Sequence, residues 1–185
     1  MKLSVILEKA QPQCVIMMGA PGSGKTYYAR QNFSSMKIID IDEINKEMFG
    51  NKGMEGGTFA KSTVIANKMT KDYIKQGKSF VKDGTAANLN TLAKFLEELK
   101  AANYHTTLVY IDVPLEVAKA QAQKREQEEG RMVPEKTIED MWAKINANFS
   151  KAKKMGFDEV IRVKRNKLNE SFFAWLDQLL LEQSL

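Results

Sequence analysis

The stretch that constrains this chain most runs from residue 14 to residue 29 and reads CVIMMGAPGSGKTYYA. Its centre, GAPGSGKT, fits the pattern GxxxxGK[S/T], in which a glycine-rich turn holds phosphate groups. The short apolar run at 14–18 is typical of a buried parallel strand, and the residues from Thr26 onwards can begin a helix. Because strand, glycine turn and helix follow in the required order, the sequence predicts a phosphate-binding loop rather than a chance turn.

Each part of this loop has an expected role. The three glycines lack a Cβ atom, so the backbone can take positive φ and approach a ligand closely. Backbone N–H groups would then point into one concavity at the positive end of a helix dipole. Lys25 would bridge the β- and γ-phosphates of a nucleotide, and the Thr26 hydroxyl would bind Mg²⁺. The predicted nucleotide-binding residues are Gly19, Ala20, Pro21, Gly22, Ser23, Gly24, Lys25, Thr26 and Tyr27.

Composition sets broad limits. The chain has 185 residues, which is near the size of one domain, and a formal net charge of +5. This charge permits a polyanionic partner but does not require one. With one cysteine, Cys14, the chain cannot form an internal disulfide, which fits a reducing compartment. No apolar run approaches the length of about 18 residues that a membrane span needs, and no signal-peptide pattern is present, so we expect a cytoplasmic protein.

Strands and helices are expected to alternate along the chain. Apolar segments predict further strands at residues 37–41, 79–81, 106–112 and 159–161. Helices are predicted at residues 24–33, 43–49, 59–76 and 89–102, after Pro114, after Pro134, and at about 169–183. This alternation predicts one α/β domain over residues 1–185, with the three-layer α/β/α fold of a P-loop NTPase. We expect a five-stranded, mostly parallel sheet and a short helical lid at about 124–133.

Two segments are harder to assign from the sequence. Residues 3–10 fit a short amphipathic helix or a lead-in to the first strand. Residues 50–57 contain four glycines and predict a flexible loop. Such a loop beside a nucleotide site is either a substrate-binding element or a plain surface connection.

Acidic residues follow the second and third predicted strands. Ligands on parallel sheets bind beyond the carboxyl ends of the strands, so these residues should converge on the glycine loop. Asp83 is expected to hold Mg²⁺ directly or through water. Asp42 is expected to accept the proton of a substrate hydroxyl, the alternative being that it caps the following helix. Asp40 lies one pleat back and is expected to give support at most.

Two arginines flank a charged turn between two predicted helices. Planar guanidinium groups stabilise the negative charge that spreads over a transferring phosphoryl group. Arg125 and Arg131 could therefore belong to a lid over the nucleotide, the alternative being solvated charges at helix ends. The single histidine, His105, begins the fourth strand at the opposite end and is expected to be structural.

These motifs, in this order and spacing, resemble the zeta-toxin group of phosphate-loop kinases and, more distantly, the bacteriophage polynucleotide kinases. The resemblance extends from residue 15 to residue 163. It is carried by GAPGSGKT, the D-x-D at 40–42, FVKDGT at the third strand, NYHTTLVYIDVP at the fourth, and KREQEEGRMVPEKTIED.

The resemblance implies specific roles for this chain. By it, Lys25 and Thr26 bind the phosphates of ATP and Mg²⁺, and Asp42 matches the catalytic base. Arg125 and Arg131 match two lid arginines that contact the γ-phosphate. Zeta toxins phosphorylate a sugar hydroxyl of UDP-N-acetylglucosamine and are held inactive by a small antitoxin.

The chain also departs from both families. Asp83 and Thr85 match the acid-Gly-Thr motif of zeta toxins, which typically carry Glu at the first position. Asn67 aligns with an acidic substrate-binding residue of zeta toxins, which makes Asp42, Asn67 and Thr85 the expected substrate positions. The polynucleotide kinases have R-D-D-x-x-R after the second strand, whereas residues 41–45 here read IDEIN, so the arginine that grips the substrate's phosphate is missing.

Together these features predict an ATP-dependent, Mg²⁺-requiring kinase that transfers a phosphoryl group to a hydroxyl of a small molecule, such as UDP-N-acetylglucosamine or a related nucleotide sugar. Two alternatives stay open: a kinase that acts on a 5′-hydroxyl or a modified base of a nucleic acid, and a nucleotide-binding switch without an acceptor. An antitoxin-like protein partner is a further expectation of the resemblance.

Overall fold

The computed structural model describes residues 11–50, 57–130 and 132–165. Within these ranges, strands and helices alternate as the sequence predicts. The strands are β1 (Gln13–Met18), β2 (Lys37–Asp40), β3 (Phe80–Asp83), β4 (His105–Asp112) and β5 (Glu159–Lys164). The helices are α1 (Lys25–Asn32), α2 (Ile41–Phe49), α3 (Thr58–Gln76), α4 (Leu89–Ala101), α5 (Leu115–Glu129) and α6 (Glu135–Ala152).

The strands form one sheet in the order β2-β3-β1-β4-β5, and every neighbouring pair is parallel. Strand β1 lies at the centre of the sheet, and its apolar side chains point alternately into two separate cores, one on each face. Cys14 and Ile16 face one core, and Val15 and Met17 face the other. A strand that is buried on both faces needs helices on both sides, which explains why nearly the whole of β1 is apolar.

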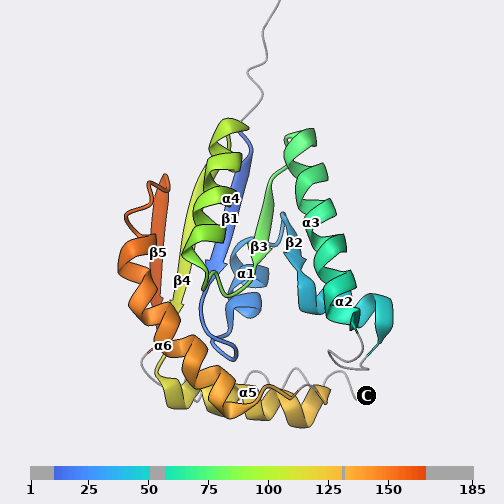
Figure 1. Ribbon diagram of the computed structural model, residues 1–185, viewed down its shortest axis with the longest axis vertical. Coiled ribbons are helices and arrows are strands. Elements are labelled where there is room, and N and C mark those ends of the chain that lie inside the picture. Colours follow the sequence, from blue (N-terminus) through green and yellow to red (C-terminus); the bar gives the residue numbers. More distant parts are fainter. Residues whose placement is uncertain (1–10, 51–56, 131, 166–185) are drawn as a thin grey trace, which may run out of the picture.

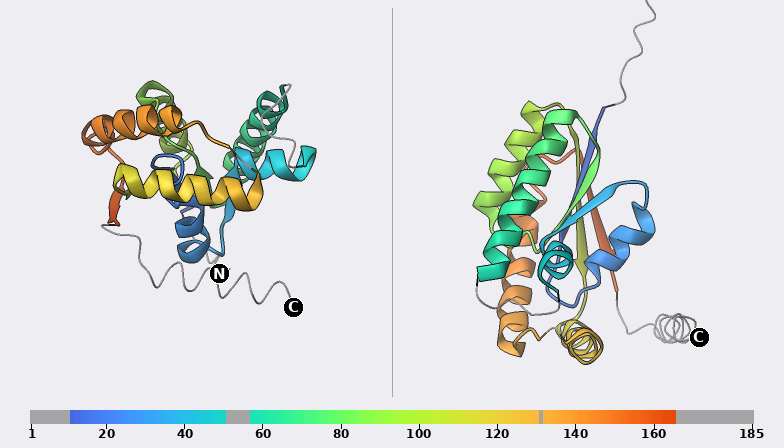
Figure 2. Two further views of the ribbon diagram at one scale, coloured as in Figure 1. Left: turned by 90° about the horizontal axis from the view of Figure 1, so that it is seen from below. Right: turned by 90° about the vertical axis from the view of Figure 1, so that its right-hand side faces the viewer.

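The helices complete three layers. Helices α3, α4 and α6 cover one face of the sheet, and α1 covers the other (Figures 1 and 2). Helix α5 crosses below the carboxyl ends of the strands, where the glycine loop also lies (Figure 1). The predicted α/β/α fold with a five-stranded sheet is therefore confirmed. None of the helices in the described ranges is both long enough and apolar enough to cross a bilayer.

Several predicted boundaries differ from the structure by one to three residues: β3 ends at Asp83 rather than at residue 81, and β5 ends at Lys164 rather than at residue 161. The second strand ends at Asp40 rather than at Ile41, and helix α2 begins directly after it. The reason is local: the Asp40 carboxylate accepts a hydrogen bond from the Asp42 backbone N–H at 2.8 Å and so starts the helix. Capping, which the sequence left open as a role for Asp42, falls to Asp40.

Several predictions lie outside the described residues. These are the lead-in at 3–10, most of the glycine-rich loop, Arg131 in the lid, and the last helix at about 169–183. Of the predicted lid, the first part is helical, because α5 continues to Glu129 and ends at Gly130 with φ 67°.

The glycine loop packs directly against the backbone of α5. A Cβ atom on Gly22 would lie 2.1 Å from the carbonyl oxygen of Ala118 and 3.1 Å from the amide nitrogen of Ala122. The φ of Gly22 is also positive, at +76°. Position 22 therefore needs glycine for two reasons, a left-handed backbone and contact with a helix.

We predict that Gly22→Ala lowers the free energy of unfolding by at least about 2 kcal/mol, because the left-handed backbone is strained and the methyl group overlaps α5. Chemical denaturation would measure the change. Gly84→Ala is the matched control, since nothing lies within 4 Å of its Cβ position. Equal stability of the two variants would contradict the packing argument.

Candidate active site

The backbone of the glycine loop is held from both sides. The Gly19 N–H donates to the carbonyl of Thr85, which follows β3, at 3.3 Å. Within the loop, the Ser23 N–H donates to the carbonyl of Ala20 at 3.1 Å. Gly24 has φ 84° and caps the start of α1. These contacts place the loop between the carboxyl end of β1 and the first turn of α1, as an anion cradle requires.

Ser23 contributes to the loop structurally. Its side chain is fully buried, and its Oγ would lie 2.7 Å from a Cβ on Gly19. Within the described part of the chain, this hydroxyl has no hydrogen-bond partner. The side chain thus fills the inside of the loop, so Ser23 remains a predicted nucleotide-binding residue only through its backbone.

The residues predicted to hold Mg²⁺ meet in the structure. The Thr26 hydroxyl at the start of α1 donates to Oδ2 of Asp83 at the end of β3, at 2.6 Å. Asp83 is 5% exposed. Burial raises the pKa of its carboxyl group, whereas the positive charge of Lys25 and the hydrogen bond from Thr26 act in the opposite direction.

This pair fits the chemistry of Mg²⁺. Magnesium prefers oxygen ligands and is commonly held in proteins by one or two carboxylates together with substrate phosphates and water. A buried carboxylate and a hydroxyl in direct contact supply two such oxygens. In the described residues, no group of three or more His, Cys, Asp or Glu side chains could hold a metal by itself.

Lys25 lies over the loop that it follows. Its Nζ donates to the carbonyl of Ala20 at 2.9 Å, and its charge lowers the pKa of Asp83. The ammonium group is therefore close to both the loop backbone and the Asp83 carboxylate. Lys25 and Asp83, from separate elements, meet at one edge of the sheet as predicted from the sequence.

Asp42 lies near the same carboxylate. It is the second residue of α2, it is partly exposed, and its negative charge raises the pKa of Asp83. The register of the sheet explains this proximity, because Asp40 pairs with Asp83 across β2 and β3. Asp42 follows Asp40 by two residues, and the cap from Asp40 fixes its backbone.

The two other predicted substrate positions have different surroundings. Thr85 is partly exposed beside the loop, to which its carbonyl is hydrogen-bonded. Asn67 lies in α3 and is exposed, whereas the preceding residue, Ala66, is buried. Asn45 in α2 is buried, and its Oδ1 accepts a hydrogen bond from the Ser62 hydroxyl at the start of α3.

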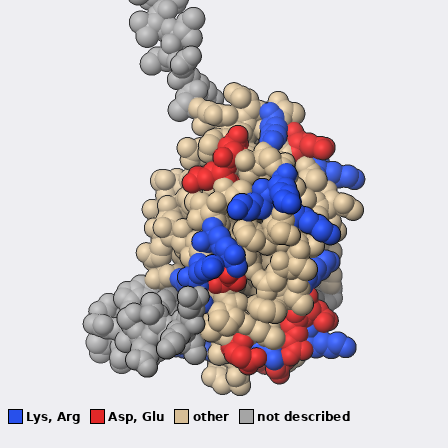
Figure 3. Space-filling view, turned by 90° about the vertical axis from the view of Figure 1, so that its left-hand side faces the viewer, with Lys and Arg blue, Asp and Glu red and all other residues tan. Residues whose placement is uncertain are grey.

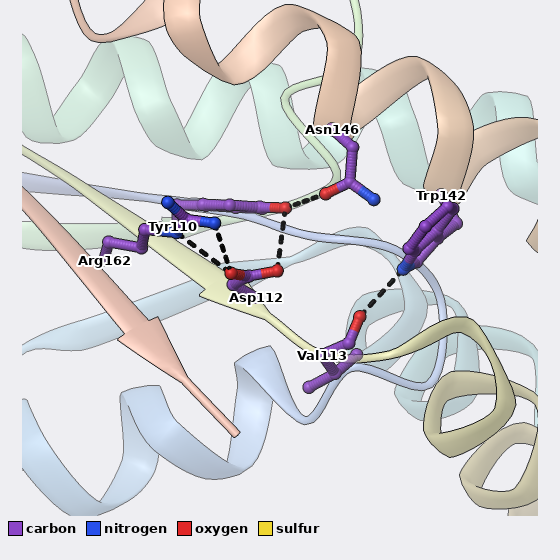
Figure 4. A network of polar contacts seen from close by, with 6 residues as sticks. All are labelled: Tyr110, Asp112, Val113, Trp142, Asn146 and Arg162. Atoms are coloured by element: carbon purple, nitrogen blue, oxygen red, sulfur yellow. Dashed lines mark hydrogen bonds and ion pairs between the residues drawn. The ribbon is translucent and has the colours of Figure 1, made fainter. Parts of the chain in front are cut away.

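The predicted lid, at about 124–133, begins in the second half of α5 and ends before α6. Arg125 is partly exposed in the second half of α5, while Arg131 lies outside the described residues. Lys119 ties the two helices together, with its Nζ 2.8 Å from Glu135 and 2.6 Å from Glu139. Helix α6 is further fixed by Trp142, whose indole N–H donates to the carbonyl of Val113 at 2.8 Å (Figure 4).

A polar network that the sequence did not predict joins α6 to the ends of β4 and β5 (Figure 4). Arg162 donates to Oδ2 of Asp112 through Nε at 2.9 Å and Nη2 at 2.7 Å. The Tyr110 hydroxyl lies between Asp112 and Asn146, and burial raises its pKa to about 12. Asp112 is the last residue of the predicted fourth strand. This position, at the carboxyl edge of the sheet, was the one sequence feature that could have pointed to a polar role for Asp112.

The sequence also did not predict that the Lys82 side chain would be partly buried and hydrogen-bonded. Its Nζ donates to the Thr70 hydroxyl at 3.1 Å, and burial lowers the pKa of its ammonium group. It lies inside the sheet between apolar residues, where the alternation of a strand gives no warning of a charge.

Solved structures share this architecture. The chain matches a structure of the Pnkp1/Rnl/Hen1 RNA repair complex with 21% identity and a TM-score of 0.65, over 78% of this chain and 48% of that one. It matches the PezAT toxin–antitoxin system of Streptococcus pneumoniae with 18% identity and a TM-score of 0.63, over 84% of this chain and 68% of that one. A protein from Chloroflexus aurantiacus matches with 14% identity and a TM-score of 0.63, over 94% and 99%.

At these identities the likeness concerns the fold. The chain spans about half the length of the matched chain in the RNA repair complex. No curated protein matched the sequence. The family model described as zeta toxin matches residues 2–175, which include the glycine loop, the Thr26–Asp83 pair and helices α5 and α6. The chain therefore belongs to the zeta toxin family, whose members share this kinase-like P-loop architecture.

Proposed function

We propose that this protein is a kinase that transfers the γ-phosphoryl group of ATP to a hydroxyl of a small molecule. The observation that carries the proposal is the Thr26–Asp83 hydrogen bond of 2.6 Å, directly below the glycine loop and beside Lys25. Loop, ammonium and metal-binding oxygens are the parts that phosphoryl transfer requires. Membership of the zeta toxin family supports the same reaction class.

The residues would divide the work by position. The loop backbone binds the phosphates, and Lys25 neutralises charge on the β- and γ-phosphates. Thr26 and Asp83 hold Mg²⁺, which supplies further charge neutralisation at the phosphates. Asp42 orients the acceptor hydroxyl and accepts its proton. Arg125, with Arg131, would stabilise the phosphoryl group as it moves.

For the acceptor we propose UDP-N-acetylglucosamine or a related nucleotide sugar, by analogy with the zeta toxins. Thr85 lies beside the loop and could contact the acceptor near the reacting hydroxyl. Asn67 instead of an acidic residue would weaken hydrogen bonds to sugar hydroxyls, because an amide bears no charge. The acceptor can therefore differ from that of the zeta toxins in the group that faces position 67.

A nucleic-acid kinase is the second candidate, since the RNA repair complex shares the fold. Two observations favour the small molecule over it. The chain lacks the arginine that grips the substrate's phosphate in polynucleotide kinases, because Ile41 and Lys46 take the two arginine positions of R-D-D-x-x-R when Asp42 matches its first Asp. On the face in Figure 3, Lys and Arg side chains are interspersed with Asp and Glu side chains, whereas a nucleic-acid track is expected to be a continuous basic stripe.

A nucleotide-dependent switch without an acceptor is the third candidate. Such proteins commonly activate water with a second acid after the metal-binding carboxylate. Here Gly84 and Thr85 follow Asp83, which favours transfer to an acceptor over hydrolysis. An antitoxin-like protein partner is also proposed, since PezAT is a toxin–antitoxin system.

Lys25→Ala is expected to reduce phosphoryl transfer by about 10²–10³-fold, the usual effect of removing one donor to developing charge. Steady-state assays with γ-labelled ATP would measure the loss. Lys68→Ala, at an exposed position of α3, is the control for the removal of one lysine. ATP consumption by Lys25→Ala at the parent rate would refute the kinase assignment.

Asp42→Asn is expected to keep ATP binding and to lose transfer by about 10²–10⁴-fold, the contribution of a general base. Asp40→Asn removes a carboxylate two residues away but keeps a good helix cap, so it should retain activity. Calorimetry with an ATP analogue and a transfer assay would separate binding from chemistry. Retained turnover in Asp42→Asn would remove this residue from its proposed role.

The acceptor is tested by offering labelled ATP to UDP-N-acetylglucosamine and, separately, to oligonucleotides with a 5′-hydroxyl. We expect label on the nucleotide sugar. Label on the oligonucleotide would favour the second candidate. Rapid ATP hydrolysis with no labelled acceptor would exclude both choices and favour the switch.

A further inference from the structure

Arg165 lies at the edge of the phosphate loop, on the side away from the catalytic carboxylates. It directly follows β5, and its backbone N–H donates to the carbonyl of Asp112 at 2.9 Å. The side chain of the same Asp112 is held by Arg162 (Figure 4). The end of β5 is thus fixed to β4, and the position of Arg165 is set by the sheet.

The alternation of the strand turns Arg165 toward the loop. Arg162 and Arg165 are three residues apart, so their side chains leave opposite faces of the sheet. Arg162 lies over the Tyr110 and Phe149 rings on the α6 side. Arg165 lies on the α1 side, with its guanidinium carbon 5.7 Å from the centre of the Tyr27 ring.

The guanidinium group of Arg165 also contacts the last glycine of the loop. Its Nη1 is 2.9 Å from the position that a Cβ on Gly24 would take, and Oε1 of Gln121 in α5 is 3.7 Å from that same position. Two planar groups, the Tyr27 ring and the Arg165 guanidinium, therefore form one wall beside the loop. This wall is bordered by α1, α5 and the end of β5.

The strand order gives this wall a place in the nucleotide site. In the order β2-β3-β1-β4-β5, the carboxylates of Asp42 and Asp83 lie on the β2–β3 side of the loop, and Arg165 lies on the β5 side. A polyphosphate whose γ end faces the two carboxylates has its other end toward β5. The nucleoside of a bound nucleotide would then extend toward Arg165 and Tyr27.

We propose that the Arg165 guanidinium, backed by the Tyr27 ring, is a stacking platform for the nucleobase of the bound nucleotide. This inference rests on the proposed nucleotide site. Arginine stacks its plane on flat aromatic groups, and every base offers such a face. The platform favours a purine over a pyrimidine through contact area, with little distinction between adenine and guanine.

Calorimetric titrations of the full chain with ATP and with inorganic tripolyphosphate test this inference. Arg165→Ala should weaken ATP binding by about 5- to 100-fold, the range for loss of one stacked base. It should leave tripolyphosphate binding unchanged, because that probe has no base. Arg165→Lys keeps the charge but loses the plane, so it should weaken ATP binding to a similar extent. Lys164→Ala, one residue earlier and exposed, is the control and should bind both probes as the parent does.

Other outcomes would overturn the inference in recognisable ways. Equal weakening of both probes would make Arg165 a phosphate ligand, and full ATP binding by Arg165→Lys would make its charge, rather than its plane, the important property. Unchanged ATP binding by Arg165→Ala would remove Arg165 from the site. Failure of the parent chain to bind ATP would instead refute the proposed function, and the inference with it. Thermal unfolding of each variant would show whether any loss comes from misfolding.

Discussion

The hydrogen bond between Thr26 and Asp83 organises the candidate site. A carboxylate that is almost fully buried is costly unless hydrogen bonds or charges compensate it. Thr26 and Lys25 provide this compensation from the first turn of α1. The bond therefore joins the end of β3 to the start of α1. The glycine loop precedes α1 and is tied to Thr85 after β3, so all three parts depend on the same junction.

A second constraint acts from below the sheet. Helix α5 touches the loop backbone at Gly22 so closely that no side chain would fit between them. Lys119 and Trp142 hold α5 and α6 together and against the end of β4. The loop is thus confined between the sheet and α5, which limits the motion of the backbone amides that would receive phosphate groups. Preorganised donors of this kind stabilise charge without reorganising as the reaction proceeds.

Sequence patterns predicted much of this arrangement. The motif GAPGSGKT located the loop, and alternating apolar segments located all five strands. Asp42 and Asp83 were assigned to one site because parallel strands end at one edge of the sheet. The patterns failed where a side chain acts through contacts far along the chain. Asp40 and Asp42 are two residues apart and chemically equal, so only backbone geometry shows that Asp40, and not Asp42, caps α2.

The sequence by itself determined the fold class and the glycine loop, and it predicted which residues would bind Mg²⁺, because these depend on short motifs and on the period of apolar residues. Only the tertiary structure decided that Gly22 packs against the backbone of α5, that Asp112 joins β4 to β5 and α6, and that Arg165 lies over the Tyr27 ring. These contacts join residues that are up to 138 positions apart, as Tyr27 and Arg165 are (165 − 27 = 138). Their partners are set by strand order and by the face on which each side chain emerges, and no local pattern records either.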